Sequence, residues 1–344
     1  MMKSVLACFL CFVTLYAKAP SLEEMIAQMI VIGFDGEKEG DQWVEQIAKD
    51  IRREKIGGVI LSQKNIQNPS QLKKLTYYLK AQSSKIPLIV AVEHDGTTPF
   101  QGFSPLLLAH DMVEKHDIVE AELVYQKSAQ ELASAGINLN FAPVLDLQEK
   151  RRSQSYSSLE EVVTSYANVF IRALKSEKIM PVVKYFPSAG ENIANDFSTE
   201  ATLSSWHFKQ LKPYYDLIAF GGLDAVLISH AMVHDLDEKN PMIFSSLVIE
   251  HLLRQKMHFE GVVFANHLRT NSISNHVAFK ERIIRAINAG VDIFVFPNYF
   301  ADEASMPFTV QRTILDAIHK KELSEKRIEL SYKRILKFKE KIRD

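Results

Sequence analysis

Polar side chains that could perform chemistry stand at the ends of several short apolar runs in this 344-residue sequence. These residues are Glu93, Asp95, Asp146, Lys184, Tyr185, His230, Asn266 and His267. Carboxylates can act as nucleophiles or proton donors, while amine, amide, imidazole and hydroxyl groups can hydrogen-bond the hydroxyls of a ligand. The pattern therefore predicts one polar site assembled from the ends of several strands.

Histidines and cysteines narrow the chemistry further. His94, His230 and His267 stand at the ends of three runs and could form a metal cluster, but a histidine bonded within the core is the commoner case. Both cysteines, Cys8 and Cys11, lie in the first 19 residues, which we expect to be removed. We therefore expect no catalytic cysteine, no metal and no cofactor.

Eight runs, many of them rich in β-branched residues, alternate with longer segments of helical character. The runs are 29–34, 58–61, 88–93, 138–142, 181–186, 224–229, 261–265 and 292–296. Most lack strict alternation, as expected of parallel strands buried on both faces, and each precedes a segment long enough for a crossover helix. This order predicts a (β/α)8 TIM barrel that forms a single domain over residues 20–344. A doubly wound sheet is the alternative, but the G-x-G-x-x-G turn typical of its first strand is absent.

Helix signals mark three of the intervening segments. Residues 70–79 follow Pro69, residues 159–174 follow a serine cluster, and Ser324 can cap the last helix. Glutamates interleave the lysines of that last helix, so we interpret its charges as a solvated face.

Composition excludes several classes of protein. Lysine and arginine total 41 against 42 aspartate and glutamate residues, so no global positive field is present to gather nucleic acid. Apolar residues make up 47% and charged residues 24%, which is typical of a folded globular chain and argues against a disordered or multi-span membrane protein.

The first 19 residues have the order of a secretory signal peptide. A positive start at Lys3 precedes the apolar run 5–16, and an Ala-x-Ala site follows at 17–19. That run is shorter than the roughly 20 apolar residues that a membrane-spanning helix needs, so we expect no stable membrane span. Residues 1–19 therefore predict export, to the periplasm.

Several ordered motifs carry a family resemblance. They are GGVIL at 57–61, AGIN at 135–138, NFAPVLD at 140–146, Lys184 with Phe186-Pro187, Pro241 with Ser245, GVV at 261–263, and Arg327-Ile328 with Arg334-Ile335-Leu336. With them the chain resembles glycoside hydrolase family 3 from about Ser21 to the last helix, in particular the single-domain β-N-acetylhexosaminidases that trim peptidoglycan fragments. The resemblance implies a TIM barrel whose relatives cleave terminal β-linked N-acetylglucosamine with retention of configuration.

The chain departs from this family at the positions that carry the chemistry. The family's nucleophile is an aspartate after the seventh strand, in a Ser/Thr-Asp-x-Leu setting, where this chain has Ala265-Asn266-His267-Leu268. The family's proton-donor loop reads Lys-His-Phe-Pro-Gly-His-Gly and then Asp-Ser-His, whereas this chain reads KYFPSAG at 184–190 and NDFS at 195–198, without histidine.

Two arginines expected from the resemblance are not at their positions. The family's Asp-x-Glu-Gly-Gly-Arg corresponds to the segment 93–98, which reads EHDGTT. The arginine of an Arg-Ser-Phe segment corresponds best to Gln154, although Arg151 or Arg152 could take its place. The retained scaffold with altered chemical groups is typical of a pseudoenzyme.

We therefore favour a non-catalytic barrel that binds a glycan containing N-acetylglucosamine or an envelope protein. The predicted binding residues are Glu93, Asp146, Lys184, Tyr185, His230, Asn266 and His267. One alternative is an active β-N-acetylhexosaminidase of peptidoglycan turnover that uses Asp95, Glu191 or Asp196 as substitute acids, provided that the pair lies about 5 Å apart. A second alternative is an envelope scaffold that has no sugar site.

Overall fold

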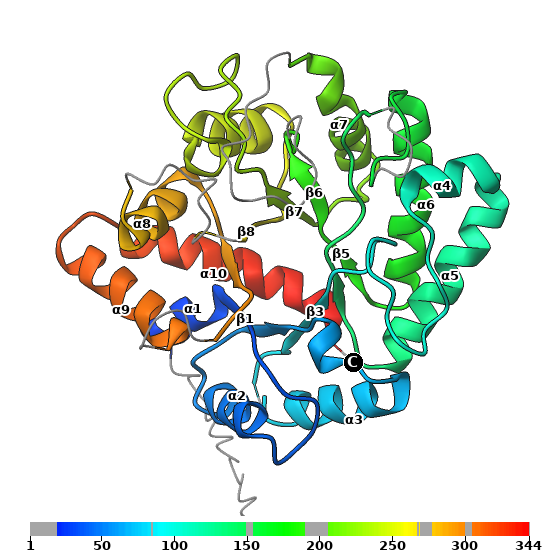
Figure 1. The fold of residues 1–344 in the computed structure, drawn as a ribbon. Coiled ribbons are helices and arrows are strands. Elements are labelled where there is room, and N and C mark those ends of the chain that lie inside the picture. The colour runs from blue at the N-terminus through cyan, green and yellow to red at the C-terminus, as the bar shows by residue number, and fades with distance from the viewer. Residues whose placement is uncertain are drawn as a thin grey trace, which may run out of the picture.

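Parallel strands enclosed by helices form a TIM barrel, as predicted (Figure 1). The computed structural model describes residues 19–83, 85–148, 154–189, 206–266, 268, 277–299 and 305–343. Its strands are β1 (Ile30–Gly33), β2 (Gly58–Ile60), β3 (Ile89–Val92), β4 (Leu139–Asn140), β5 (Met180–Pro181), β6 (Val183–Phe186), β7 (Ala225–Ile228), β8 (Val262–Asn266) and β9 (Ile293–Phe296).

Strand order shows how the barrel closes. The order β5-β4-β3-β2-β1-β9-β8-β7-β6 places β5 and β6 at the two ends of the sheet, although only Val182 separates them in the chain. The predicted run 181–186 therefore holds parts of two strands, one pairing with β4 and the other with β7. The other seven predicted runs hold one strand each. Neighbours follow chain order around the ring, so the doubly wound alternative is wrong.

The strands are apolar because both of their faces are covered. Every residue of β1, β3, β7 and β9 is buried. Gly58 begins β2 where a side chain would not fit, since an added Cβ would lie 2.6 Å from Cβ of Ile89 on the neighbouring strand. Glycine therefore permits the close approach of β2 and β3.

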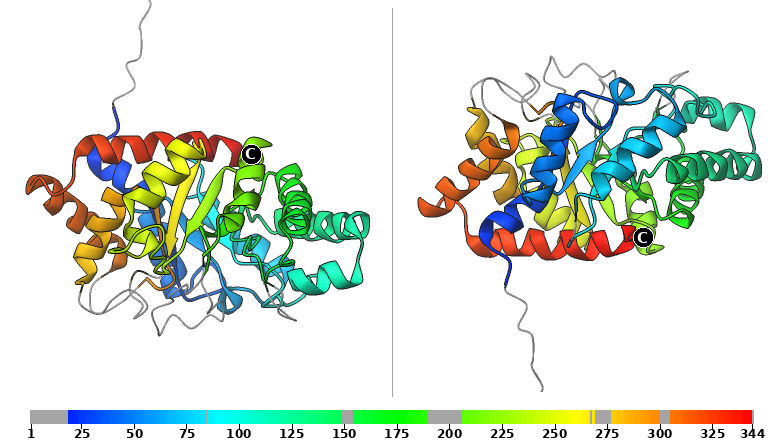
Figure 2. Two further views of the ribbon diagram at one scale, coloured as in Figure 1. Left: turned by 90° about the horizontal axis from the view of Figure 1, so that it is seen from above. Right: turned by 90° about the horizontal axis from the view of Figure 1, so that it is seen from below.

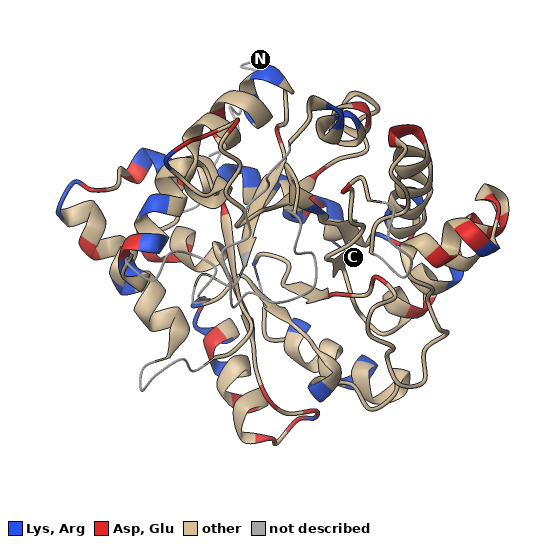
Figure 3. Ribbon diagram, turned by 45° about the horizontal axis from the view of Figure 1, so that its top comes forward, with Lys and Arg blue, Asp and Glu red and all other residues tan. Residues whose placement is uncertain are grey.

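Helices form the outer layer. They are α1 (Leu22–Gln28), α2 (Gln42–Arg52), α3 (Pro69–Lys80), α4 (Ala109–Lys115), α5 (Ile118–Ser134), α6 (Glu160–Ser176), α7 (Lys212–Ala219), the π-helix η4 (Leu247–Lys256), α8 (Phe279–Ala289), α9 (Met306–His319) and α10 (Glu325–Lys339). The three predicted helices are confirmed as α3, α6 and α10, and the Ser324 hydroxyl caps α10 by accepting a hydrogen bond from the Arg327 amide at 3.2 Å. Acidic and basic residues are interspersed over this layer (Figure 3).

Helix α10 lies across one end of the barrel, beside α1 (Figure 2). Its interpretation as a solvated charged face is wrong for several of its basic side chains. Arg327 and Arg334 both contact the buried Asp292 immediately before β9, at 3.3 Å, and Arg254 of η4 contacts the same carboxylate at 2.7 Å. Asp292 precedes its strand, so α10 covers the amino-terminal end of the barrel and leaves the carboxyl ends of the strands at the opposite end.

None of the helices in the described part of the chain has the length and apolar character required to cross a bilayer.

Candidate active site

Lys184 is the centre of a buried charge cluster at the carboxyl ends of the strands. Its side chain rises from β6 with no exposed surface. The Nζ atom donates hydrogen bonds to Glu93 Oε1 and, at 2.9 Å, to Asp95 Oδ2. Asp95 is 5% exposed, whereas Glu93 is 48% exposed. The structure therefore brings Lys184 together with two predicted residues that lie 91 and 89 positions earlier in the sequence.

Lys184 and Asp95 both keep their charges near neutral pH. Burial alone would lower the pKa of Lys184, but the neighbouring Tyr185, Glu93 and Asp95 raise it well above its ordinary value. Burial opposes ionisation of Asp95, yet the Lys184 ammonium and the Thr97 hydrogen bonds hold the pKa of Asp95 below its ordinary value. Asp95 is consequently an ion-pair partner and a poor proton donor.

Neutral groups complete the surroundings of Asp95. Its Oδ1 accepts hydrogen bonds from the Thr97 amide at 3.1 Å and from the Thr97 hydroxyl at 2.5 Å. Its Oδ2 accepts a third from Gln154 Nε2 at 3.3 Å. Gln154 thus occupies this site as a neutral amide, where the resemblance leads one to expect an arginine.

Asp146 lies buried beside the loop that follows β6. Its Oδ1 accepts hydrogen bonds from the Ser188 hydroxyl and from the Ala189 amide, the latter at 2.8 Å. Burial raises the pKa of Asp146 to about 6, although these hydrogen bonds oppose the shift. Asp146 therefore fixes the first residues of this loop, a contact that sequence spacing gave no means to detect.

Asn140 and His94 hold the backbone of the site in place by hydrogen bonding to each other. Asn140 Oδ1 accepts from the His94 amide at 2.8 Å, and its Nδ2 donates to the His94 carbonyl at 2.9 Å. The His94 ring stacks on Phe100 with centroids 4.8 Å apart, and burial lowers its pKa to about 4. His94 is therefore a neutral core histidine, and the described residues include no cluster of metal-ligand type.

The remaining predicted residues are placed as follows. Tyr185 is half-buried, and its ring centroid lies 5.5 Å from Lys184 Nζ; burial raises its pKa to about 12. His230 is half-buried after β7, and Asn266 ends β8. The Asn266 side chain and the residues Glu191, Asp196 and His267 lie outside the described part of the chain.

A cavity of about 500 Å³ opens beside the charge cluster. Glu93 and Gln154 line it together with groups after β2, β3 and β9, namely Gln63, Thr97, Thr98 and Pro297. This volume falls within the range of small-ligand sites, and its amide, hydroxyl and carboxylate groups suit a ligand rich in hydroxyls. The half-exposed Glu93 links the cavity to Lys184.

The described carboxylates near the cavity all have partners within the protein. Retaining glycosidases require an attacking carboxylate and a proton donor about 5 Å apart. Glu93 and Asp95 both form ion pairs with Lys184. The raised pKa of Asp146 suits a proton donor, but this residue is 3% exposed and is hydrogen-bonded to the loop that follows β6. These carboxylates thus have structural partners that limit their use as a catalytic pair.

Comparison with known proteins identifies the family. The family model of the glycosyl hydrolase family 3 N-terminal domain matches residues 21–338. A beta-hexosaminidase of Psychromonas ingrahamii is 33% identical over 263 residues, which are 71% of this chain and 76% of that protein. A beta-hexosaminidase of Tolumonas auensis is 29% identical over 262 residues, covering 72% of this chain and 77% of that protein.

Solved structures agree with the barrel fold. A glycoside hydrolase family 3 beta-N-acetylglucosaminidase from a Paenibacillus species superposes with a TM-score of 0.85 and 26% identity, over 94% of this chain but only 63% of that one. The beta-N-acetylhexosaminidase of Beutenbergia cavernae, at 23% identity, shares the fold with a TM-score of 0.81 over 94% of this chain and 99% of its own. The chain therefore belongs to glycosyl hydrolase family 3, with a β-hexosaminidase-like barrel.

Proposed function

We propose that this protein is an exported family 3 barrel that binds a glycan containing N-acetylglucosamine and does not hydrolyse it. The observation that carries the proposal is Asn266 at the end of β8, where the family resemblance places the nucleophilic aspartate. An amide has no negative charge with which to attack the anomeric carbon or to stabilise the positive charge that develops there.

A second substitution weakens proton donation. The resembled family carries histidine at the position of Tyr185 in β6 and in the segments that follow, whereas this chain has no histidine in 184–190 or 195–198. Burial raises the pKa of Tyr185 to about 12, so its phenol is a weak acid near neutral pH. Loss of a general acid typically lowers the rate by roughly 10² to 10⁴-fold, in addition to the loss of the nucleophile.

Glycan binding is supported by groups that remain at the mouth of the barrel. Lys184 matches a position that contacts sugar in the resembled family, and its partner Glu93 lines the polar cavity. Relatives named beta-hexosaminidase and beta-N-acetylglucosaminidase support an N-acetylglucosamine-containing ligand. His230 and Asn266 are further proposed contacts because they stand at neighbouring strand ends.

Hydrolysis by substitute acids is the competing proposal, and the beta-hexosaminidase relatives favour it. Of its candidates, Asp95 is held by Lys184 and Thr97. Glu191 and Asp196 would then have to supply the chemistry. An envelope scaffold without a sugar site is a third outcome that the same experiment separates from the other two.

The decisive experiment measures turnover and binding on the same purified protein. We expect no release of nitrophenol from a chromogenic N-acetyl-β-glucosaminide above a no-enzyme control, and saturable binding of muropeptides by calorimetry. Asn266→Asp alone should restore little or no turnover because the proton donor remains absent. His319→Asn, at the carboxyl end of α9, is the control for an unrelated substitution.

Two results would contradict the proposal in different ways. Substantial wild-type turnover that disappears in Glu191→Gln or Asp196→Asn would establish an enzyme with relocated acids. Absence of both turnover and glycan binding would favour the scaffold.

Export is checked separately by mass spectrometry of the native protein. We expect an amino terminus near Pro20 or Ser21, and an intact Met1 on cytoplasmic protein would exclude export.

A further inference from the structure

Lys339, the last residue of α10, is a buried cation at the amino-terminal end of the barrel. The residue is 1% exposed. Its Nζ donates to Gln28 Oε1 at 2.7 Å and to the Gly57 carbonyl at 2.6 Å. Both acceptors are neutral, and no carboxylate of the described residues forms an ion pair with this ammonium.

This arrangement differs from that of the other cations at the same end. Arg327 and Arg334 share the carboxylate of Asp292, and Lys341 contacts Asp224. A buried ammonium without a counter-charge carries a desolvation cost that neutral acceptors only partly offset. Burial accordingly lowers the pKa of Lys339 to about 7. An anion supplied from outside the chain would relieve this cost.

A cavity of about 440 Å³ gives such an anion a place. Lys339 and both of its acceptors, Gln28 and Gly57, line it. One wall is apolar and comes from the ends of α2 and β3 and the residues beside them, namely Ile51, Ile56, Ile86 and Leu88. Charged residues form much of the remaining lining, and the volume is in the range of small-molecule sites.

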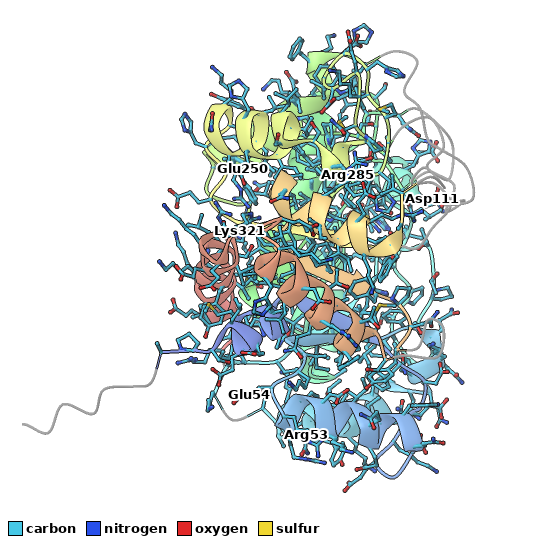
Figure 4. The ribbon with its side chains drawn as sticks, turned by 90° about the vertical axis from the view of Figure 1, so that its left-hand side faces the viewer. Arg53, Glu54, Asp111, Glu250, Arg285 and Lys321 are labelled. Carbon is cyan, nitrogen blue, oxygen red and sulfur yellow. The ribbon has the colours of Figure 1, made fainter. Side chains whose placement is uncertain are left out.

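The charges at the rim leave the cavity open to an anion. Lys85 lies 2.8 Å from Glu54 and 3.9 Å from Glu24, so one ammonium offsets both carboxylates in part. The Ser21 amide also donates to Glu24 at 2.6 Å. Arg52 donates to the neutral Gln82 amide at 2.6 Å, which adds a second cation. In Figure 4, Glu54 lies on the same side of the molecule as Lys321, opposite Asp111.

We propose that this cavity binds a small carboxylate with an apolar tail, whose charge pairs with Lys339. The tail would contact the isoleucine and leucine walls, and the carboxylate would accept a hydrogen bond from the ammonium. The site lies at the opposite end of the barrel from Lys184 and is independent of glycan binding.

Calorimetry with sodium hexanoate tests the proposal. We expect saturable binding to the wild-type protein, and weaker binding of 1-hexanol, which has the same tail without the charge. Lys339→Met keeps the length of the side chain and removes the ammonium, so hexanoate affinity should fall roughly ten- to a hundredfold, the value of one charge-assisted hydrogen bond. Lys337→Met, on the exposed face of the same helix, should bind as the wild type does.

The pH dependence of hexanoate affinity can be measured on the wild-type protein. The other titratable groups facing the cavity are Glu24, Glu54, Arg52, Lys85, Tyr332 and, after the proposed cleavage near Pro20, the new amino terminus, so the same pH series is measured on Lys339→Met as well. The pKa of Glu24 is lowered, and those of Lys85 and Tyr332 are raised, so these three keep one charge state between about pH 6 and 9. Hexanoate affinity should therefore decrease as pH rises through the pKa of Lys339 and the ammonium loses its proton.

Three results would overturn the proposal. They are absence of saturable hexanoate binding, equal affinity for hexanoate and hexanol, and an affinity that stays constant from about pH 6 to 9. Circular dichroism establishes whether Lys339→Met is folded; if it is not, the hexanol comparison and the pH series decide the question.

Discussion

Replacement of Lys184 by methionine probes the charge cluster at the barrel mouth. Asp95 would remain 5% exposed without its cationic partner, and Glu93, at 48% exposed, would return largely to solvent. Removing one member of a buried ion pair typically costs about 3 to 5 kcal/mol because the other charge is left uncompensated. The Glu93 contact should add little to this, since ion pairs with exposed partners contribute about 0 to 1 kcal/mol.

The sign of the pH dependence follows from Asp95. In the wild-type protein the pKa of Asp95 is below its ordinary value. Ionised Asp95 therefore stabilises the fold at any pH above the pKa that it has in the unfolded chain. This stabilisation is lost as pH falls through its pKa in the folded protein. In Lys184→Met the dominant remaining effect is burial, which raises the pKa of Asp95 and makes its ionised form unfavourable. The stability gap between the two proteins should therefore be widest near neutral pH and should narrow on acidification.

Urea denaturation of four proteins measures the effect: wild type, Lys184→Met, Asp95→Asn and the double variant. Because the neutral amide introduced by Asp95→Asn needs no cation, the double variant should lose much less stability than the sum of the two single changes. Two results would refute the reasoning. One is a Lys184→Met variant within about 0.5 kcal/mol of wild type, and the other is full additivity of the two single changes.

Two further changes test other buried carboxylates, Asp292 and Asp146. Asp292→Asn should lower the free energy of unfolding by about 3 to 5 kcal/mol near neutral pH, because it removes the shared partner of Arg254, Arg327 and Arg334. Urea denaturation measures this loss. Because the pKa of Asp292 is lowered, the loss should shrink as pH falls below about 4. Asp146→Asn should instead stabilise the protein at about pH 8 by up to roughly 2 to 3 kcal/mol, since burial raises the pKa of Asp146 to about 6 and its ionised form is unfavourable. This gain should disappear near pH 4, and an equal effect at both pH values would contradict it.

The barrel could be predicted because its strands carry a local signal. Parallel strands buried on both faces are continuous apolar runs, and such runs stand out between helical segments whatever their partners are. The division of 181–186 into β5 and β6 has no such signal. It follows from strand pairing, since β5 pairs with β4 and β6 with β7.

The candidate site could be predicted only in part. Placement of Glu93, Asp95 and Lys184 at one end follows from barrel topology, but their pairing depends on side-chain geometry across the barrel. The structure shows Lys184 in ion pairs with Glu93 and Asp95, while its contact with a glycan stays a prediction. The charges of α10 were misinterpreted for the same reason, because Asp292 lies 35 residues before Arg327.

Separation of the two ends of the barrel explains how chemistry can change while the family fold persists. The amino-terminal end is held by α10, by the Asp292 cluster and by the packing of Phe264 on Phe338, at 6.0 Å between ring centroids. None of these contacts involves the loops at the carboxyl ends of the strands. On the proposed mapping, Asn266 in place of an aspartate would remove a catalytic charge without removing a contact from this stabilising cluster. Selection on stability and selection on activity act on different residues of this fold, so loss of the nucleophile need not be accompanied by loss of the barrel.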